Sequence, residues 1–340
     1  MQGFTAARWI AGASCLIAAG CGGGAGPDAV PPEQRARGVT LSDWTADGYR
    51  SPGCSLALDE IAAAGATSVA LIVTWYQDDP ATVFVSPVNG RTPTDAALSQ
   101  AVVGARQRGL SVTVKPHVDV LDGTWRANIR PELPELWFQI YGGLLVPLAE
   151  RAAAWGAERF VIGTELAGLA GEEALWRDLI DRVRQVYPGR IVYSASWDEA
   201  MFVSFWDAVD EVGVSAYFPV AVRTNPTRVD LLAGWQVWRE RMARLHQRTG
   251  KPVLFTEIGY RSVDGAGMRP YVHDSDPAED AGEQADLYWA ALHATRDDSW
   301  LSGMYWWDWR VDGSGGPGNR DYTPFRKPAA DVLRSFWGEE

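Results

Sequence analysis

Two glutamates in this sequence share one local pattern, in which each directly follows a threonine that ends an apolar run. Glu165 lies in the segment RFVIGTELAG, and Glu257 lies in the segment KPVLFTEIGY. A single glutamate in such a place is most simply explained as one half of a salt bridge. A pair indicates acid–base chemistry, because two carboxyl groups in different environments can divide the roles of proton donor and ionised nucleophile.

A second set of polar residues, Lys115, His117 and Asp119, alternates along the segment KPHVD. Alternation places all three side chains on one face of an extended strand. Charged groups on a buried face are costly unless they have partners. We expect these residues to recognise substrate hydroxyl groups beside the carboxyl pair. The alternative is an internal ion pair between Lys115 and Asp119.

Aromatic residues are abundant, with 17 tryptophans among 340 residues. Tryptophan offers a flat apolar face and an N–H donor, which suit the C–H face and the hydroxyl groups of a sugar ring. Tyr217 is expected to donate to a carboxylate, with a core tyrosine as the alternative. Because neighbours on a strand point to opposite faces, only one of Trp306 and Trp307 should face the site. The aromatic candidates at strand ends are Trp75, Trp197, Tyr217, Trp306 and Trp307.

These residues need a scaffold that brings distant strand ends together. From Arg37 onward, short apolar segments alternate with amphipathic ones, which is typical of parallel strands joined by helices. Eight such units predict an α/β fold, a single closed (β/α)8 TIM barrel. The alternative is an open doubly wound sheet, but the first predicted strand is followed by LSDWTADG and not by a glycine-rich phosphate loop. The strands are predicted at residues 38–44, 68–76, 110–119, 159–165, 190–197, 211–219, 251–257 and 301–309.

Such a barrel gathers the carboxyl ends of its strands around one rim, where catalytic residues lie. Strands four and seven are nearly opposite, so Glu165 and Glu257 should face each other. Two carboxyl groups about 5 Å apart among aromatic residues indicate a retaining glycoside hydrolase. A metal site of Glu165, Glu257, His117 and Asp119 is an alternative, although the sequence has no compact ligand motif such as HExxH. We therefore expect no metal and no cofactor.

The charge of the chain limits its partners. The formal net charge is −12, and the sequence isoelectric point is about 4.9. Nucleic acid requires a basic surface and is not expected as a partner. A neutral polysaccharide or oligosaccharide is compatible with this charge. Hydrophobic residues make up 46% of the chain, which is enough for a large core. We expect the protein to be a monomer.

The N-terminal residues are predicted to be a targeting segment. Arg8 precedes an apolar run, and LIAAGC resembles a bacterial lipobox that ends at Cys21. We therefore expect a lipoprotein signal peptide at residues 1–20, lipidation of Cys21, a flexible Gly/Pro-rich tether at residues 21–36 and the hydrolase domain at residues 37–340. The protein is expected to be exported to the bacterial cell envelope and to contact the membrane through its lipid anchor only. The alternative is secretion after ordinary signal cleavage.

Five segments, IGTEL, KPHVD, SASW, SAYFP and TEIGYRS, together resemble glycoside hydrolase family 113. The similarity extends from about Arg37 to Gly338. It implies a retaining (β/α)8 hydrolase of β-1,4-linked mannan or manno-oligosaccharides, with Glu165 as the acid/base and Glu257 as the nucleophile. The resemblance also places in the sugar-binding region Lys115, His117, Trp197, Tyr217 and one tryptophan of YWWDW.

One position departs from the pattern of the wider clan. Much of the clan has an asparagine directly before the acid/base, where it binds the 2-hydroxyl of the sugar, and this chain has Thr164. A threonine hydroxyl can still bind, but it offers one donor where an amide offers two. Because the 2-hydroxyl distinguishes mannose from glucose, hydrolysis of another neutral glycan such as β-glucan stays open. A lipoprotein that binds glycan without cleaving it is the other alternative.

Overall fold

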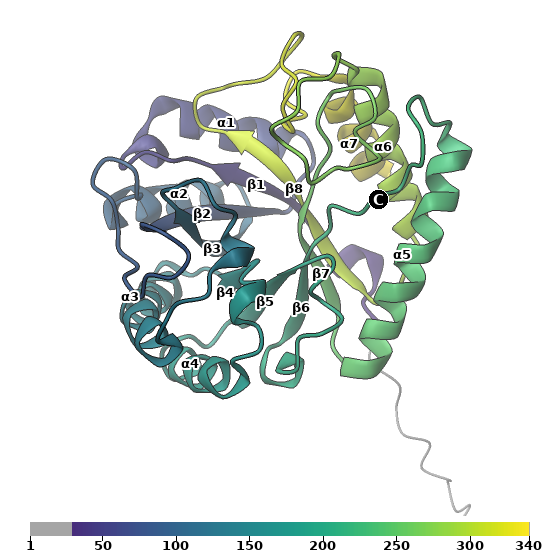
Figure 1. Cartoon of the computed structure of the whole chain (residues 1–340). Helices are drawn as coiled ribbons and strands as arrows, with labels where there is room; N and C mark the ends of the chain where they lie inside the picture. Colours follow the sequence, from purple (N-terminus) through teal and green to yellow (C-terminus); the bar gives the residue numbers. More distant parts are fainter. Residues whose placement is uncertain (1–28, 340) are drawn as a thin grey trace, which may run out of the picture.

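The computed structural model describes residues 29–339, in which eight parallel strands close into a barrel (Figure 1). Each strand pairs with the next one along the chain, and β8 pairs with β1, so the sheet has no open edge. The predicted TIM barrel is confirmed. The loops after the strands leave from one end of the barrel, which we call the mouth. The strands are β1 (Ala36–Ser42), β2 (Ser68–Gln77), β3 (Ser111–Val120), β4 (Arg159–Thr164), β5 (Arg190–Ser196), β6 (Glu211–Ser215), β7 (Val253–Ile258) and β8 (Leu301–Arg310).

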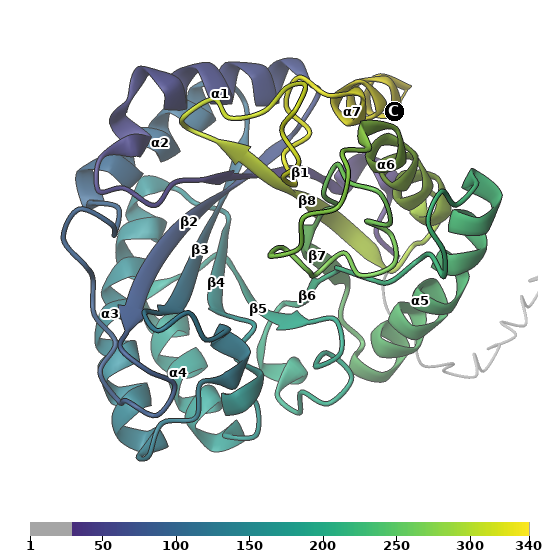
Figure 2. The same ribbon diagram turned by 45° about the horizontal axis from the view of Figure 1, so that its top comes forward.

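Helices surround the barrel on its outside (Figure 2). They are α1 (Pro52–Ala63), α2 (Asp95–Gln107), α3 (Pro134–Trp155), α4 (Glu173–Val186), α5 (Arg228–Thr249), α6 (Ala281–Thr295) and α7 (Pro328–Glu339). The connection from β5 to β6 is shorter. Within residues 29–339 it holds a 3-10 turn at Trp206–Ala208 where the other β-to-β connections hold an α-helix.

Local sequence determines where several helices begin. Ser51 caps α1 by accepting a hydrogen bond from the N–H of Cys54, and Pro52 occupies the first helical position, where its missing N–H costs nothing. Thr94 caps α2 in the same way, by accepting from the N–H of Ala97. These caps lie at the mouth, so they also fix where the loops that shape the mouth end.

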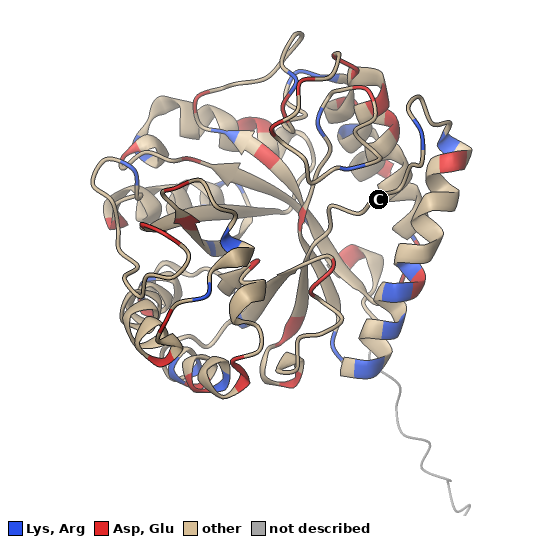
Figure 3. Ribbon diagram, viewed as in Figure 1, with Lys and Arg blue, Asp and Glu red and all other residues tan. Residues whose placement is uncertain are grey.

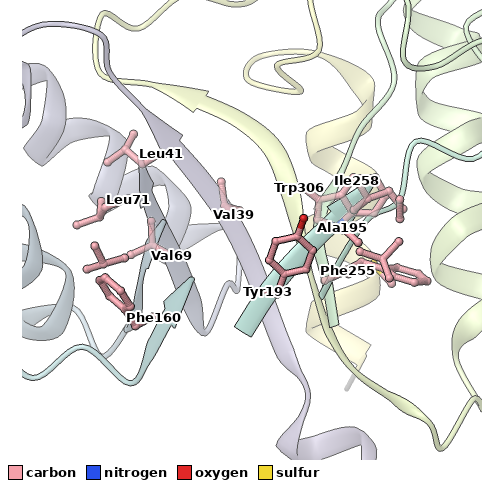
Figure 4. Close-up of a cluster of buried hydrophobic side chains, with 14 of the residues drawn as sticks. Val39, Leu41, Val69, Leu71, Phe160, Tyr193, Ala195, Phe255, Ile258 and Trp306 are labelled. Carbon is pink, nitrogen blue, oxygen red and sulfur yellow. The ribbon is translucent and has the colours of Figure 1, made fainter. Parts of the chain in front are cut away.

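Apolar side chains form two separate layers, because successive strand residues point to opposite faces of the sheet. The outer layer lies between the strands and the helices and forms one continuous core (Figure 4). It includes Val39, Leu41, Val69, Leu71, Phe160, Tyr193, Ala195, Phe255, Ile258 and Trp306. The inner layer, inside the barrel, is a small cluster of Ala36, Ala70, Val161, Val192, Leu254 and Tyr305.

Tyr305 closes the interior of the barrel at the end away from the mouth. Its hydroxyl oxygen lies 2.6 Å from Ser68 Oγ and 2.7 Å from Thr113 Oγ1. Gly38 makes room for the ring, since a Cβ at that position would lie 2.5 Å from Tyr305 Cδ1. The interior is therefore filled with side chains below the mouth, as in other small barrels.

The chain reaches the barrel at the end opposite the mouth, where β1 begins at Ala36. The preceding residues already contact the barrel: the N–H of Val30 donates to the carbonyl of Ser299 at 2.8 Å, and Arg35 donates to carbonyls that follow α6. The folded domain therefore begins before the predicted boundary at residue 37. The predicted signal peptide and Cys21 lie outside the described residues.

Charged side chains lie mainly on the helices and loops that surround the barrel (Figure 3). Many of them pair along one helix or between neighbouring helices, as Arg177 does with Glu173 at 2.8 Å. In residues 29–339, no helix combines the length and the apolar character needed to cross a membrane.

A buried ion pair at the end of the barrel opposite the mouth provides a test of the stability of the barrel. Arg159 Nε lies 2.7 Å from Glu211 Oε2, and the side chains are 6% and 1% exposed. Replacing Glu211 with alanine should lower the free energy of unfolding by about 3–5 kcal/mol, because it leaves a guanidinium buried without its partner. Urea unfolding followed by tryptophan fluorescence measures this loss.

The matched control is Asp59→Ala, which breaks an exposed pair with Arg108. Exposed pairs contribute about 0–1 kcal/mol, so this variant should unfold close to the wild type. Equal losses in the two variants would contradict the role assigned to the buried pair.

Candidate active site

The alternating row of β3, which is Lys115, His117 and Asp119, points into the mouth and contacts Glu257. Lys115 Nζ lies 2.5 Å from Glu257 Oε1 and also donates to the carbonyl of Thr256 at 3.1 Å. His117 Nε2 lies 3.5 Å from the same carboxylate oxygen. Lys115 therefore pairs with Glu257 across the barrel, and the predicted alternative of an internal pair with Asp119 is wrong.

Glu257, near the end of β7, is held by donors from two other strands. Besides Lys115 on β3, Tyr217 follows β6 and donates its hydroxyl to Glu257 Oε2 at 2.8 Å. Burial by itself would raise the pKa of Glu257, but the charge of Lys115 and the hydrogen bonds outweigh it and hold the pKa below its ordinary value. Glu257 is thus an ionised carboxylate at neutral pH.

His117 links Glu257 to the aromatic residues of the mouth. Burial, with the positive charge of Arg126, lowers its pKa to about 4, so the imidazole is neutral at neutral pH. Its ring stacks on Trp307 with centroids 5.9 Å apart and an interplanar angle of 9°. Trp44, which follows β1 and is 37% exposed, meets Trp307 edge to face at 6.4 Å. Together these rings form an aromatic wall beside Glu257.

Glu165, directly after β4, has a different environment. Its φ is +53°, in the left-handed region that residues other than glycine rarely adopt, and its N–H donates to the carbonyl of Ser194 at 2.7 Å. Burial and then the negative charge of Glu257 raise its pKa above the ordinary value, against the opposing charge of Arg126. The surroundings of the two glutamates therefore shift their pKa values in opposite directions. Strained backbone of this kind concentrates at functional sites.

Two residues that the sequence did not single out contact Glu165. They are Trp125 and Arg126, in the loop after β3, and they donate to Glu165 Oε2 at 3.3 Å and 3.2 Å. Arg126 also pairs with Asp119, so one guanidinium links Asp119 to Glu165. The sequence does place an aromatic residue directly before a cationic one, in the loop that follows the three polar residues of β3. That pattern could have identified Trp125 and Arg126 as candidates.

Two of the predicted aromatic residues face away from the mouth. Trp75 packs edge to face on Tyr141 of α3, with centroids 5.8 Å apart, and Trp306 stacks on Tyr288 of α6 at 3.9 Å. The prediction that Trp75 binds substrate is therefore wrong, and Trp306 is the outward-facing member of the pair of which only one was expected to face the site. The reason is strand parity: β2 continues past Trp75 to Gln77, and the inward positions are the alternate ones. Trp307 is the inward-facing member of its pair.

Other predicted residues lie at the rim or just below it. Trp197 follows β5 and stacks on Tyr271 at 5.9 Å, in the loop between β7 and α6. Thr164 is buried and donates its hydroxyl to the carbonyl of Pro116 at 3.0 Å, so its one donor is used inside the barrel. Thr164 therefore cannot donate to a sugar hydroxyl in this arrangement, contrary to the sequence-based expectation.

The three carboxylates of the alternative metal site are already paired with cations. Lys115 occupies one side of Glu257, and Arg126 lies between Glu165 and Asp119. A divalent cation beside these carboxylates would meet the positive charges of Lys115 and Arg126, so the donor set does not fit a metal. The arrangement instead fits one carboxyl group that can exchange a proton with a substrate beside a second one that stays ionised.

A cavity of about 830 Å³ lies away from this chemistry, at the end of the barrel opposite the mouth. One of the acidic residues that line it, Asp210, pairs with Arg184 at 2.8 Å. This cavity is not the candidate active site, because it lies at the other end of the barrel from Glu165 and Glu257.

Two solved structures are close to this chain in fold and extent. A complex of a GH113 β-1,4-mannanase is 26% identical, with a TM-score of 0.84, and the match covers 90% of this chain and 100% of that one. The GH113 β-mannanase of Alicyclobacillus acidocaldarius, solved with ManMIm, is 27% identical, with a TM-score of 0.82 and coverage of 90% and 97%.

More distant structures share the fold alone. A β-glucuronidase of Faecalibacterium prausnitzii is 16% identical, with a TM-score of 0.61, and the match covers 90% of this chain and 49% of that one. Among curated protein sequences, none matches this chain significantly.

The family comparison agrees with the nearer structures and with the geometry of the mouth. The family model described as Glycoside Hydrolase Family 113 matches residues 40–327, which span every strand from β2 to β8 and the end of β1. A match of this extent is decisive for membership. The chain is a glycoside hydrolase and belongs to glycoside hydrolase family 113.

Proposed function

We propose that this protein hydrolyses β-1,4-linked mannan or manno-oligosaccharides by double displacement, with retention of anomeric configuration. The observation that carries the proposal is the contrast between the surroundings of the two glutamates at one mouth. Glu257 is paired with Lys115 and stays ionised, while burial and the charge of Glu257 raise the pKa of Glu165. The relatives at 26% and 27% identity, both β-mannanases, support mannan as the substrate.

In the first step, a carboxylate oxygen of Glu257 attacks the anomeric carbon, and the bond from that carbon to the glycosidic oxygen breaks. The electron pair stays on the leaving oxygen, which takes the proton of Glu165. In the second step, Glu165 removes a proton from water, whose oxygen displaces Glu257 and restores the carboxylate. Tyr217 and Lys115 hold Glu257 in place throughout, and the faces of Trp307 and Trp44 support the sugar ring.

The function can be tested on mannan, β-glucan and xylan by measuring products of the wild type and of Glu257→Ala side by side. Mannan should give oligosaccharides with the wild type, and the variant should lose about 10⁴-fold or more in turnover because the nucleophile is missing. Sodium azide should restore part of the activity and give a mannosyl azide of inverted configuration, since azide takes the place of the carboxylate.

Glu283→Gln is the matched control, because Glu283 is a buried glutamate of α6 that accepts from the N–H groups of Gly265 and Gly267 and pairs with neither Glu165 nor Glu257. It should keep most of the wild-type activity. Products from β-glucan alone would support the β-glucan alternative. Binding of oligosaccharides without any product would support a glycan-binding protein, and full activity of Glu257→Ala would remove Glu257 from the mechanism.

The pH dependence of kcat/KM should have two limbs. Activity should fall at low pH as Glu257 gains a proton and at high pH as Glu165 loses one. In Lys115→Met, the pKa of Glu257 should rise because its cation is gone, so the acidic limb should move up by about one pH unit or more. Titration of mannan hydrolysis against pH measures the shift.

Lys251→Met removes the same charge from the loop before β7, at the other end of the barrel. Its pH profile should match that of the wild type. An unmoved acidic limb in Lys115→Met would mean that Lys115 does not control the protonation of Glu257.

We further propose that the protein is an exported cell-envelope lipoprotein anchored at Cys21. The sequence around Cys21 supports this proposal, and the entry of the chain at the end opposite the mouth would leave the mouth facing away from the membrane. In a bacterial host, Cys21→Ser should move the protein from the membrane fraction to the soluble fraction. Cys54→Ser, which changes a buried thiol in α1, should stay with the membrane. An unchanged distribution of Cys21→Ser would exclude the anchor.

A further inference from the structure

The two side chains that donate hydrogen bonds to the Glu165 carboxyl group contact the same oxygen, and this bears on proton transfer. Trp125 Nε1 and Arg126 Nη1 both donate to Oε2, at 3.3 Å and 3.2 Å. Within residues 29–339, Oε1 receives no hydrogen bond, and the Glu165 side chain keeps 10% of its surface exposed. The two oxygens of one carboxyl group are therefore not equivalent.

Arg126 is itself held by several partners. It pairs with Asp119, its Nε donates to the carbonyl of Val118 at 3.3 Å, and its side chain is only 17% exposed. Three contacts on one guanidinium fix its position relative to β3 and to Glu165. Asp119 thus acts on Glu165 through Arg126. This gives Asp119 a role in positioning Arg126, which does not require that Asp119 bind the sugar directly.

A proton on Oε2 would compete with two N–H donors that need its lone pairs, one of them cationic. A proton on Oε1 has no such competitor. We propose that Arg126 is a positioning residue that, with Trp125, occupies Oε2 of Glu165 and so assigns proton donation to Oε1. This inference rests on the proposed role of Glu165 as acid/base, which the family resemblance implies without naming Arg126 or Trp125.

The same cation assists the chemistry in the first step. When Oε1–H gives its proton to the leaving oxygen, Glu165 becomes a carboxylate, and Arg126 is in place to stabilise that negative charge on Oε2. A leaving group that departs without protonation does not need this assistance. The contribution of Arg126 should therefore depend on how poor the leaving group is.

Several other titratable groups lie near Glu165 and form the electrostatic surroundings in which Arg126 acts. Glu257 on β7 raises the pKa of Glu165, whereas Lys115 on β3 and Arg126 lower it. The neutral His117 and the paired Asp119 lie on β3, and Glu199, in the turn after β5, has a pKa raised to about 7 by burial. Removing Arg126 leaves the effect of Glu257 less opposed, so the pKa of Glu165 should rise and the basic limb of activity should move to higher pH.

The experiment compares Arg126→Gln with the wild type on mannan and on 2,4-dinitrophenyl β-mannobioside. We expect kcat/KM on mannan to fall about tenfold or more, since general acid catalysis contributes about 10²–10⁴-fold. On the dinitrophenyl substrate, which needs no proton, kcat/KM should stay within about threefold of the wild type. The basic limb on mannan should move to higher pH. Arg126→Lys should recover part of the loss, and Trp125→Phe, which keeps the cation, should leave the basic limb closer to the wild type.

The matched control is Arg130→Gln, which removes the same charge from an exposed position in the same loop. It should leave both substrates and both limbs unchanged. Equal losses of Arg126→Gln on the two substrates, with an unmoved basic limb, would overturn the inference and leave Arg126 as a structural residue of the loop. A wild type that cleaves neither substrate would instead contradict the proposed function, so the two failures are distinguishable.

Discussion

The buried pair between Lys115 and Glu257 is the interaction on which the organisation of the mouth depends. Its two members come from β3 and β7, on different sides of the barrel, and both side chains are almost fully buried. Such a pair is costly to desolvate and is retained only where its geometry is good and further hydrogen bonds are made. Thr256 and Tyr217 supply those bonds. A fixed negative charge at Glu257 then follows, and burial together with this charge raises the pKa of Glu165.

The barrel therefore separates two carboxyl groups of the same chemical type by their surroundings alone. Glu257 has a cation and a phenol as close partners, whereas Glu165 has burial and a nearby negative charge, moderated by Arg126. Divided environments of this kind are how one site holds a proton donor beside an ionised group near neutral pH. The aromatic wall of Trp307, His117 and Trp44 stands beside this pair. The geometry is thus suited to the chemistry of the family to which the chain belongs.

The loops at the mouth are as important as the strands. The loop after β3 reaches Glu165 through Trp125 and Arg126. The loops after β7 and β8 lie side by side, where Lys327 Nζ binds the Ser262 hydroxyl at 2.8 Å and Asn319 Oδ1 at 2.9 Å (Figure 2). These contacts join segments that are distant in sequence, so the shape of the mouth is a property of the whole closed barrel.

Periodicity and strand-end composition were sufficient to predict the barrel, the Glu165–Glu257 pair and the inward row of Lys115, His117 and Asp119. These features follow from local rules: apolar runs form buried strands, alternate residues share a face, and parallel strands in a barrel end at one rim. The same rules predicted that Trp306 and Trp307 would face opposite ways, without saying which would face inward.

Only the tertiary structure decided the partners of these residues. It paired Lys115 with Glu257, turned Trp75 and Trp306 toward helices, engaged Thr164 inside the barrel, and brought Arg126 to Glu165. Pairing across a barrel depends on strand register, on where each strand ends and on the path of each loop. These are properties of long-range closure, which a local pattern of residues does not encode.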